Sequence, residues 1–505
     1  MDLGTVMRWT AERFPERPAV RGHGRHLSYR EWDARTNRLA RALAAEGVRP
    51  GARVAFALTG GEPLASLHLA AQKLGAVSVP LSTRFSPDEL RYCVTDAAAA
   101  LIVTDEANAA RAAAAAGEVA LRTVVEIDAG AEREPDHALG THPAETDVSV
   151  MLYTSGTTGR PKGVPRTHRA EHSAAVAHAV QTQQRAGEVV LGVMPMFHTM
   201  GLRTLLTSIV VGGAWVGQPA FDADESIELV STENVTSLYL VPTIFWSLLR
   251  TGRLSEARSL DRLAYAGAAM TPALAERLVE EVAPRAFVNH FGSTEIYTFT
   301  IGPDVAAKPG SAGRAGIFSR VRLVAPEPGT PPDALVAPGE QGQVIASLAS
   351  PEAFAGYWQR PDADAKAIRD GWYYTGDLAV ADEDGDLWVS GRVDDMINSG
   401  GENIYPDEIE AALVRCPDVD DVCVVGLPDE RWGQAVTAFV VPARNADPVA
   451  AAEKAMAFAR EVLPSLKRPK RVIAVHAIPR SGVGKTLRRT LVAGEFEPLG
   501  ESTRG

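Results

Sequence analysis

Short apolar runs alternate with helix-like segments along the first part of this chain of 505 residues. Runs at residues 54–58, 77–81 and 100–103 are typical of buried strands, and helix-like segments separate them at residues 63–74 and after Ser86. Ser86 stands three residues before a glutamate, which is a capping-box signal for a helix start. Parallel strands joined by crossover helices produce this alternation, so we expect an α/β fold.

The same alternation resumes further along the chain in four more apolar runs, at residues 148–154, 188–194, 235–240 and 262–265. We therefore expect a second α/β sheet subdomain. From about residue 310 to residue 391, short strands separated by Pro/Gly turns indicate a small β-barrel. Beyond Asp394 the pattern is that of a smaller α+β segment. The expected organisation is a large N-terminal domain at residues 1–393 and a C-terminal domain at residues 394–505.

Composition and charge exclude several protein classes. Hydrophobic residues make up 46% and charged residues 23%, as in ordinary globular proteins, and the net charge of −12 argues against a general nucleic-acid binder. Three cysteines are too few and too scattered for a disulfide framework or a zinc site, so a reducing cytoplasm is expected. Residues 1–14 lack a signal-peptide pattern, and the apolar stretch 205–216 is too short to span a bilayer.

One loop is dense in glycine and hydroxyl groups. Residues 153–164 read Tyr-Thr-Ser-Gly-Thr-Thr-Gly-Arg-Pro-Lys-Gly-Val and directly follow the strand-like run 148–152. Glycines let backbone N–H groups approach anionic oxygens, hydroxyls add donors and Lys162 adds charge. The segment predicts a site for a nucleotide triphosphate; the alternative is an ordinary polar surface loop. It is not a Walker loop, because Pro161 stands where that pattern requires glycine.

The remaining candidates each have a structural alternative. Glu295, in Phe-Gly-Ser-Thr-Glu, is either an Mg²⁺ ligand or part of a helix cap. Asp377 either forms a turn or accepts hydrogen bonds from ribose hydroxyls. His198 has apolar neighbours, which favours a core histidine. The basic run 466–471 is either a solvated face or a contact for a phosphorylated cosubstrate.

Taken together and in this order, the motifs resemble the adenylate-forming superfamily of acyl- and aryl-CoA synthetases, peptide-synthetase adenylation domains and luciferases. The resemblance covers nearly the whole chain and rests on residues 153–163, 291–295, 374–378, 391–410 and 479–485. Gly-Gly-Glu-Asn-Ile-Tyr-Pro and Asp-Glu-Arg-Trp-Gly-Gln look most like CoA ligases of the benzoate and 4-chlorobenzoate type. No carrier-protein domain follows Lys485, which also favours CoA as the acceptor.

The resemblance implies a reaction in two steps. A carboxylate attacks the α-phosphorus of ATP, pyrophosphate leaves with Mg²⁺, and CoA then converts the acyl-AMP to a thioester and AMP. Lys485, Glu295, Thr154 and Lys162 would be catalytic, with Glu295 as the metal ligand. The residues implied for ATP and AMP are Thr154, Ser155, Gly156, Thr157, Thr158, Gly159, Lys162, Gly267, Thr294, Asp377, Arg392 and Lys485. Asp394 matches the hinge about which the C-terminal domain would move.

The resemblance also implies the acid and CoA sites. The acyl pocket would be lined by Ala177, His198, Tyr239, Gly267, His290, Gly292, Tyr297 and Thr298. CoA would contact Arg84, Gly400, Gly401, Asn403, Trp432 and Arg468. His290 and Tyr297 make this pocket more polar than the chlorobenzoate pattern, which favours a small aromatic or heteroaromatic acid such as a hydroxybenzoate, aminobenzoate or furoate.

The expected activity is therefore that of an ATP-dependent acid–CoA ligase in the cytoplasm, without nucleic-acid or membrane partners. Three alternatives stay open: an aryl-acid adenylating enzyme that loads a carrier protein, a medium- or long-chain fatty acyl-CoA synthetase, and an inactive ligand sensor of the same fold. Whether the protein forms a homodimer is also left open by the sequence.

Overall fold

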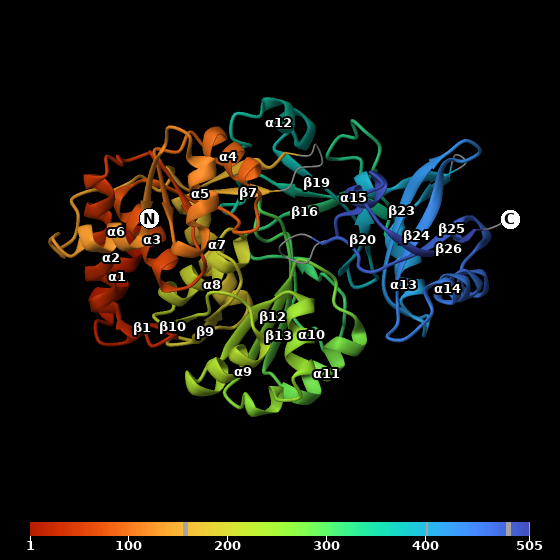
Figure 1. The fold of residues 1–505 in the computed structure, drawn as a ribbon, viewed down its shortest axis with the longest axis horizontal. Helices are drawn as coiled ribbons and strands as arrows, with labels where there is room; N and C mark the ends of the chain where they lie inside the picture. The colour runs from red at the N-terminus through yellow and green to blue at the C-terminus, as the bar shows by residue number, and fades with distance from the viewer. Residues whose placement is uncertain (155–159, 400–401, 481–485, 504–505) are drawn as a thin grey trace. The chain divides into compact units, whose positions relative to one another are not determined.

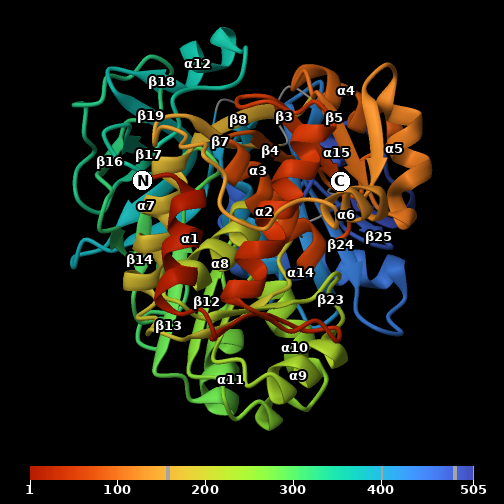
Figure 2. The same cartoon turned by 90° about the vertical axis from the view of Figure 1, so that its left-hand side faces the viewer.

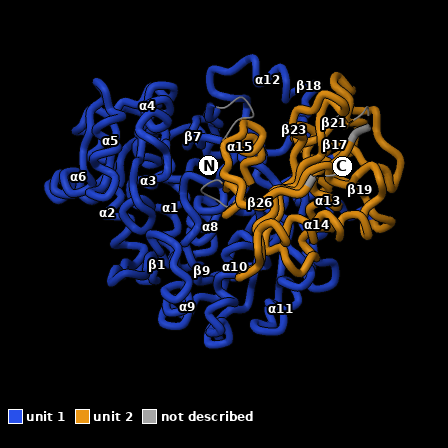
Figure 3. Tube along the Cα trace, turned by 45° about the vertical axis from the view of Figure 1, so that its right-hand side comes forward, with its two compact units in different colours: residues 1–321, 345–374, 385–387 blue, residues 322–344, 375–384, 388–505 orange. Residues whose placement is uncertain are grey.

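The computed structural model describes residues 1–154, 160–399, 402–480 and 486–503 (Figure 1). The chain divides into two compact units, shown in different colours in Figure 3. The first comprises residues 1–321, 345–374 and 385–387, and the second comprises residues 322–344, 375–384 and 388–505. The expected domain boundary at residues 393/394 stays a prediction.

One sheet of the first unit has six strands in the order β6-β5-β3-β4-β7-β8. Neighbouring strands from β6 to β7 are parallel, and β8 is antiparallel to β7. The strands are β3 (Arg53–Ala57), β4 (Val77–Pro80), β5 (Leu101–Thr104), β6 (Ala120–Thr123), β7 (Val148–Thr154) and β8 (Lys162–Thr167). The run at residues 148–154 was expected in the second subdomain; that assignment is wrong, because β7 pairs with β4 of the first sheet.

A second sheet of nine strands has the order β15-β14-β13-β12-β11-β9-β10-β1-β2. Its central strands, β1 to β13 in this order, run parallel, and antiparallel strands close both edges. The strands are β1 (Pro18–Arg21), β2 (Leu27–Ser28), β9 (Val189–Gly192), β10 (Ala214–Gly217), β11 (Ser237–Leu240), β12 (Arg262–Ala266), β13 (Ala286–Phe291), β14 (Thr300–Gly302) and β15 (Arg314–Ala315). The N-terminal strands β1 and β2 thus belong to the later sheet.

Helices cover these sheets, and the helix start expected at Ser86 is confirmed. Capping boxes at Ser28 and Ser86 begin α2 and α4. Figures 1 and 2 show α10 and α11 beside strands β12 and β13. The helices are α1 (Leu3–Arg13), α2 (Tyr29–Ala45), α3 (Glu62–Leu74), α4 (Pro87–Asp96), α5 (Ala109–Ala116), α6 (Val124–Ala131), α7 (His168–Gln181), α8 (Thr199–Val210), α9 (Ala223–Thr232), α10 (Pro242–Arg250) and α11 (Pro272–Val282).

The segment expected as a small β-barrel is a five-stranded sheet of order β16-β17-β19-β18, with β20 beside β19. Its strands are β16 (Val321–Val324), β17 (Gln341–Ser347), β18 (Ile368–Arg369), β19 (Trp372–Ala381) and β20 (Leu387–Arg392), and α12 (Pro361–Ala367) precedes β18. The ribose candidate Asp377 lies within β19.

The last part of the chain forms a six-stranded sheet of order β22-β21-β24-β25-β26, with β23 beside β24. Arg488 joins its elements through ion pairs to Asp395, Asp407 and Glu410 at 2.9, 3.1 and 2.8 Å. The elements are β21 (Ile397–Ser399), β22 (Glu402–Ile404), α13 (Pro406–Leu413), β23 (Val419–Asp429), β24 (Gly433–Pro442), α14 (Pro448–Val462), β25 (Arg471–Val475), α15 (Arg488–Val492) and β26 (Pro498–Thr503).

Among the helices of the described residues, none is both long and apolar enough to cross a bilayer.

A buried histidine provides a pH probe of the first unit. His68 in α3 is fully buried against Ser78 of β4, with Nδ1 2.9 Å from the hydroxyl oxygen. Burial lowers the pKa of its imidazole from 6.5 to about 3. Below pH 6.5 the unfolded chain binds a proton that the folded chain does not, so the stability contributed by the neutral ring falls as the pH falls from 6.5 towards 3.

We predict that His68→Gln reduces the acid sensitivity of the first unit. Between pH 6.5 and pH 5 the wild type should lose about 1.4 kcal/mol more per pH unit than the variant, because one proton fewer is linked to unfolding. Urea unfolding followed by tryptophan fluorescence at both pH values measures this difference. Parallel pH profiles of the two proteins would contradict it.

Candidate active site

The phosphate-loop candidate is the turn of a hairpin. Strands β7 and β8 pair antiparallel, and Thr154 stands opposite Lys162. The two residues that flank the loop are thereby held side by side at the end of the first sheet. The loop residues Ser155, Gly156, Thr157, Thr158 and Gly159 lie outside the described residues. Their predicted role in phosphate binding stays a prediction.

Tyr357 connects two of the three catalytic candidates in the first unit. The Lys162 ammonium lies 4.1 Å from the centre of the Tyr357 ring, and the Tyr357 hydroxyl donates to Glu295 Oε1 at 2.7 Å. A cation over a ring face is attracted by the ring's quadrupole. The lysine predicted for phosphate and the carboxylate predicted for Mg²⁺ are therefore brought together through one aromatic side chain.

Glu295 sits in a tight turn between β13 and β14. A Cβ added at Gly292 would lie 2.1 Å from the Tyr297 carbonyl oxygen, so only glycine fits this close approach. The Ser293 hydroxyl accepts a hydrogen bond from the Glu295 backbone N–H at 3.2 Å. Within residues 292–299, all of which the structure describes, no helix begins. The helix-cap alternative for this motif is wrong.

A buried arginine binds this turn to the phosphate hairpin. Arg166 in β8 has no exposed side-chain surface and forms an ion pair with Glu171 of α7. Its Nη1 donates to the carbonyl oxygens of Thr294 and Glu295 at 3.0 and 3.1 Å. Its guanidinium carbon lies 3.6 Å from the centre of the Tyr297 ring, whose hydroxyl donates to Glu171 at 3.1 Å.

Four of the residues expected to line the acyl pocket lie in one buried polar cluster. Tyr239 of β11 and His290 of β13 stack near His178 of α7, with ring centres 4.7 to 5.3 Å apart. Arg203 of α8 donates to the Tyr239 hydroxyl at 3.3 Å, and its Nη1 lies 3.2 Å from His290 Nδ1. We call this group the ring cluster; its members are His178, Arg203, Tyr239, His290, Tyr297, Thr298 and Glu352.

Burial sets the charge of the ring cluster. It lowers the pKa of His178 and of His290 well below the usual value, with the Arg203 cation adding to the effect. Burial also raises the pKa of Tyr239 and of Tyr297. Both imidazoles and both phenols are therefore neutral at pH 7, and they offer hydrogen bonds rather than charge.

The other pocket candidates are dispersed over nearby elements. Ala177 is fully buried in α7, and Gly267 follows β12 with a φ of +85°. His198 occupies the N-cap position of α8 without making a side-chain cap, and burial of its ring lowers its pKa to about 4.

Two of the ribose candidates pair within the second unit. Arg392 Nη1 donates to Asp377 Oδ1 at 2.5 Å, and its Nη2 donates to the Thr375 carbonyl oxygen at 3.2 Å. Gly376 stands between Thr375 and Asp377 and has a φ of +77°, and a Cβ there would lie 2.8 Å from Arg392 Nη2. The backbone that presents Asp377 therefore requires glycine at this position. Asp394 lies exposed in a short 3-10 helix, η3 (Val393–Asp395).

The CoA candidates are divided between the units. Arg84 is exposed in the first unit. In the second unit, Arg468 Nε donates to the Leu463 carbonyl oxygen at 2.8 Å, and the Trp432 ring lies under the cations of Arg431 and Lys470. Asn403 is placed by its backbone in β22, opposite Asn398. Gly400, Gly401 and the predicted catalytic Lys485 lie outside the described residues.

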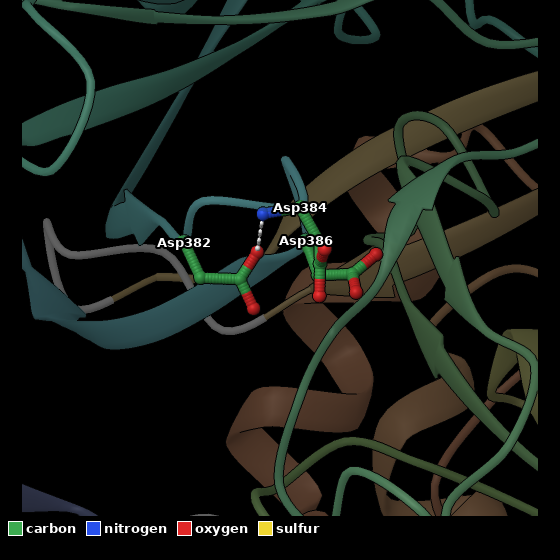
Figure 4. A group of neighbouring side chains, drawn as sticks. All are labelled: Asp382, Asp384 and Asp386. Atoms are coloured by element: carbon green, nitrogen blue, oxygen red, sulfur yellow. Dashed lines mark hydrogen bonds between the residues drawn. The ribbon is translucent and has the colours of Figure 1, made fainter.

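Three aspartates follow one another in the turn between β19 and β20 (Figure 4). Asp382 accepts a hydrogen bond from the Asp384 backbone N–H at 3.0 Å, and Asp386 forms ion pairs with Lys308 and Arg314 at 2.6 and 2.9 Å. Turn formation and these ion pairs explain the three carboxylates without a metal ion.

Sequence reasoning missed the residues that connect the predicted ones. Tyr357, Arg166 and Arg203 lie outside the recognised motifs, and their side chains reach the site only through the fold. Glu171 and Glu352 are likewise ordinary glutamates in the sequence. The only available signal was Arg203 itself, a charged residue inside the apolar stretch before Leu205.

Breaking the buried ion pair should cost stability. We predict that Arg166→Met destabilises the first unit by about 3–5 kcal/mol, because Glu171 keeps a buried charge without its partner. Denaturant unfolding measures the loss. The matched control is Arg166→Met with Glu171→Gln, which removes both charges and should recover part of it. If the free energy of unfolding of Arg166→Met lay within about 1 kcal/mol of the wild-type value, the ion pair would not support the fold.

The sequence profile of the AMP-binding enzyme family matches residues 7–358, and that of the AMP-binding enzyme C-terminal domain matches residues 408–485. A feruloyl-CoA synthase of Amycolatopsis sp is 37% identical over 481 residues, covering 94% of this chain and 95% of the relative. A 4-chlorobenzoate–CoA ligase of Arthrobacter sp is 33% identical over 497 residues, covering 96% of this chain and 94% of the relative.

Among solved structures, ATP-bound MatB from Rhodopseudomonas palustris superimposes with a TM-score of 0.89 at 28% identity, covering 98% of this chain and 99% of that chain. The expected family, the α/β fold and the expected enzyme class, an AMP-forming acid–thiol ligase, are confirmed. By the extent of these matches, the chain belongs to the AMP-binding enzyme family.

Proposed function

We propose that this ligase activates a small aromatic or heteroaromatic acid and transfers it to CoA. The observation that carries the proposal is the ring cluster, in which buried, neutral aromatic side chains occupy positions expected to line the acyl pocket. Flat rings packed 4.7 to 5.3 Å apart favour a flat substrate over a flexible alkyl chain. The names of the two relatives, feruloyl-CoA synthase and 4-chlorobenzoate–CoA ligase, support an aromatic acid.

In the first half-reaction the acid's carboxylate attacks the α-phosphorus of ATP. Lys162 and the hydroxyls and N–H groups of residues 154–159 would hold the β- and γ-phosphates, and Asp377 with Arg392 would hold the ribose. Lys485 would offset the charge that develops between the carboxylate and the α-phosphate. In the second half-reaction the CoA thiol attacks the acyl carbonyl, and AMP leaves.

Among the described residues, Glu295 is a well-formed candidate for an Mg²⁺ ligand. Glu295 is buried, and Tyr357 donates to its Oε1, which orients the carboxylate and leaves Oε2 for coordination. Mg²⁺ is held by one or two carboxylates together with phosphate oxygens and water, so this carboxylate beside Lys162 suits the ion. When bound, the ion would neutralise charge on the phosphates.

The second unit would supply the CoA-binding groups. Trp432 and Arg468 would contact the nucleotide portion of CoA, with Arg84 contributing from the first unit. Asp394 would be the hinge at the start of a C-terminal domain comprising residues 394–505. Rotation there would exchange Lys485 for the loop at residues 400–405 between the two half-reactions.

The test is a pyrophosphate-release screen with ATP and Mg²⁺ over benzoate, hydroxybenzoates, aminobenzoates, furoate, cinnamates and C6 to C12 fatty acids, each with and without CoA. The proposal predicts CoA-dependent turnover of a ring acid with formation of its thioester. Adenylate that accumulates without thioester would favour loading of a carrier protein. Turnover of fatty acids alone would replace the aromatic acid, and no turnover at all would favour a ligand sensor.

The role of Tyr357 can be tested separately. Tyr357→Phe keeps the ring near Lys162 but removes the hydrogen bond that orients Glu295, so the Mg²⁺ concentration for half-maximal activity should rise about tenfold. Tyr265→Phe, which removes a buried hydroxyl elsewhere in the first unit, is the control and should leave this concentration unchanged. An equal response in both variants would exclude the metal-orienting role.

A further inference from the structure

Arg203 is a buried cation whose charge is not matched by direct contacts. Its side chain belongs to α8, and the residue is 2% exposed. Nη1 contacts two neutral groups, the Tyr239 hydroxyl and His290 Nδ1. Nε and Nη2 are buried and have no hydrogen-bond partner in the described part of the chain. Burying such a group unpaired costs several kcal/mol, so these nitrogens require an acceptor.

Glu352 is the complementary case. It is 0% exposed, and neither carboxylate oxygen has a hydrogen-bond partner within 3.5 Å among the residues described, although the Thr298 hydroxyl lies near enough to lower the pKa of the carboxyl group. Burial raises the pKa of its carboxyl group, while the nearby guanidinium groups of Arg203 and Arg166 act in the opposite direction. Of the two cations, Arg203 has the larger influence. Among the described residues no ion pair within 4.0 Å joins Glu352 to Arg203, so these two buried charges interact without a direct contact.

Arg166 is not the missing partner of Glu352. Its ion pair with Glu171 and its bonds to two carbonyl oxygens use most of its donors, although its Nη2 is also unpartnered. The four charges therefore form one direct pair, Arg166 with Glu171, and one separated pair, Arg203 with Glu352. Beside the separated pair, His290 Nε2 also lacks a partner among described residues.

The separated pair, Arg203 and Glu352, would be satisfied by a group that both accepts and donates hydrogen bonds. A hydroxyl does both with a single oxygen atom, because it accepts from a guanidinium N–H and donates to a carboxylate. A second carboxylate would suit Arg203 but would be repelled by Glu352. A ring without a polar substituent would leave both charges without a hydrogen-bond partner. Such a ring would therefore bind much more weakly than a ring that carries a hydroxyl.

We propose that Arg203 and Glu352 are specificity-determining residues that recognise a hydroxyl group on the ring of the substrate acid. This inference rests on the proposed function, because the acyl pocket is placed here by Tyr239, His290 and Tyr297 of the ring cluster. It narrows the substrate class from aromatic acids in general to hydroxyaryl acids, with the hydroxyl between Arg203 and Glu352.

The first test uses the unaltered enzyme and matched acids. CoA-dependent pyrophosphate release is measured for benzoates and cinnamates with a 3- or 4-hydroxyl, with the corresponding methoxy group, and with hydrogen at the same position. Terephthalate supplies a second carboxylate. The best hydroxy acid should exceed its unsubstituted parent by at least about tenfold in kcat/KM, and terephthalate should be poor.

The second test uses Arg203→Met and Glu352→Gln. Each should lower the ratio of kcat/KM for the hydroxy acid over its parent at least about fivefold, mainly by raising KM for the hydroxy acid. Arg262→Met is the matched control: Arg262 is equally buried, but it pairs with Glu188 and Asp261 outside the ring cluster, so its loss should leave the ratio unchanged. If Arg203→Met does not fold, the wild-type series and Glu352→Gln decide.

Four outcomes would overturn the inference. A wild-type preference for unsubstituted or methoxy acids would show that no hydroxyl is recognised. A preference for terephthalate would show that Arg203 binds a second anion. Equal losses for the hydroxy acid and its parent in both variants would show that the pair is satisfied by water and serves the fold. Turnover of no ring acid at all would overturn the proposed function itself, and the inference with it.

Discussion

The guanidinium group of Arg166 is the contact on which the first unit's site depends. It extends from the strand that follows the phosphate loop, pairs with Glu171 of α7 and donates to the backbone of the turn that carries Glu295. A fully buried arginine is tolerated only when most of its donors are satisfied. The phosphate hairpin and the carboxylate turn are therefore held as one body, which preorganises the groups that would meet ATP.

Around this contact the protein places neutral rings rather than additional charges. His178, His290, Tyr239 and Tyr297 are all held uncharged by burial, and two arginines and two glutamates lie beside them. A low-polarity surrounding strengthens each electrostatic contact and makes each unpaired group costly. If this cluster binds the acid, as we propose, it would select by hydrogen-bonding complementarity to the buried polar atoms of Arg203 and Glu352.

Local signals were readable from the sequence because they depend on neighbouring residues. The capping box at Ser86 and the strand before the phosphate loop both follow from short-range chemistry. The sheet to which each strand belongs could not be predicted from the sequence, because the apolar run of β7 is typical of a buried strand in either sheet. Tyr357 and Glu352 were missed for the same reason: their roles come from side chains far away in sequence.

The central claim, that the acid is activated as an adenylate, can be tested by following its oxygen atoms. With an acid labelled with ¹⁸O in its carboxylate, ATP and CoA, mass spectrometry of the products shows where the label goes. The account predicts one ¹⁸O atom in the phosphate of AMP, because the oxygen that attacks the α-phosphorus stays with AMP when the thioester forms. Unlabelled AMP, or label in inorganic phosphate together with ADP, would contradict it.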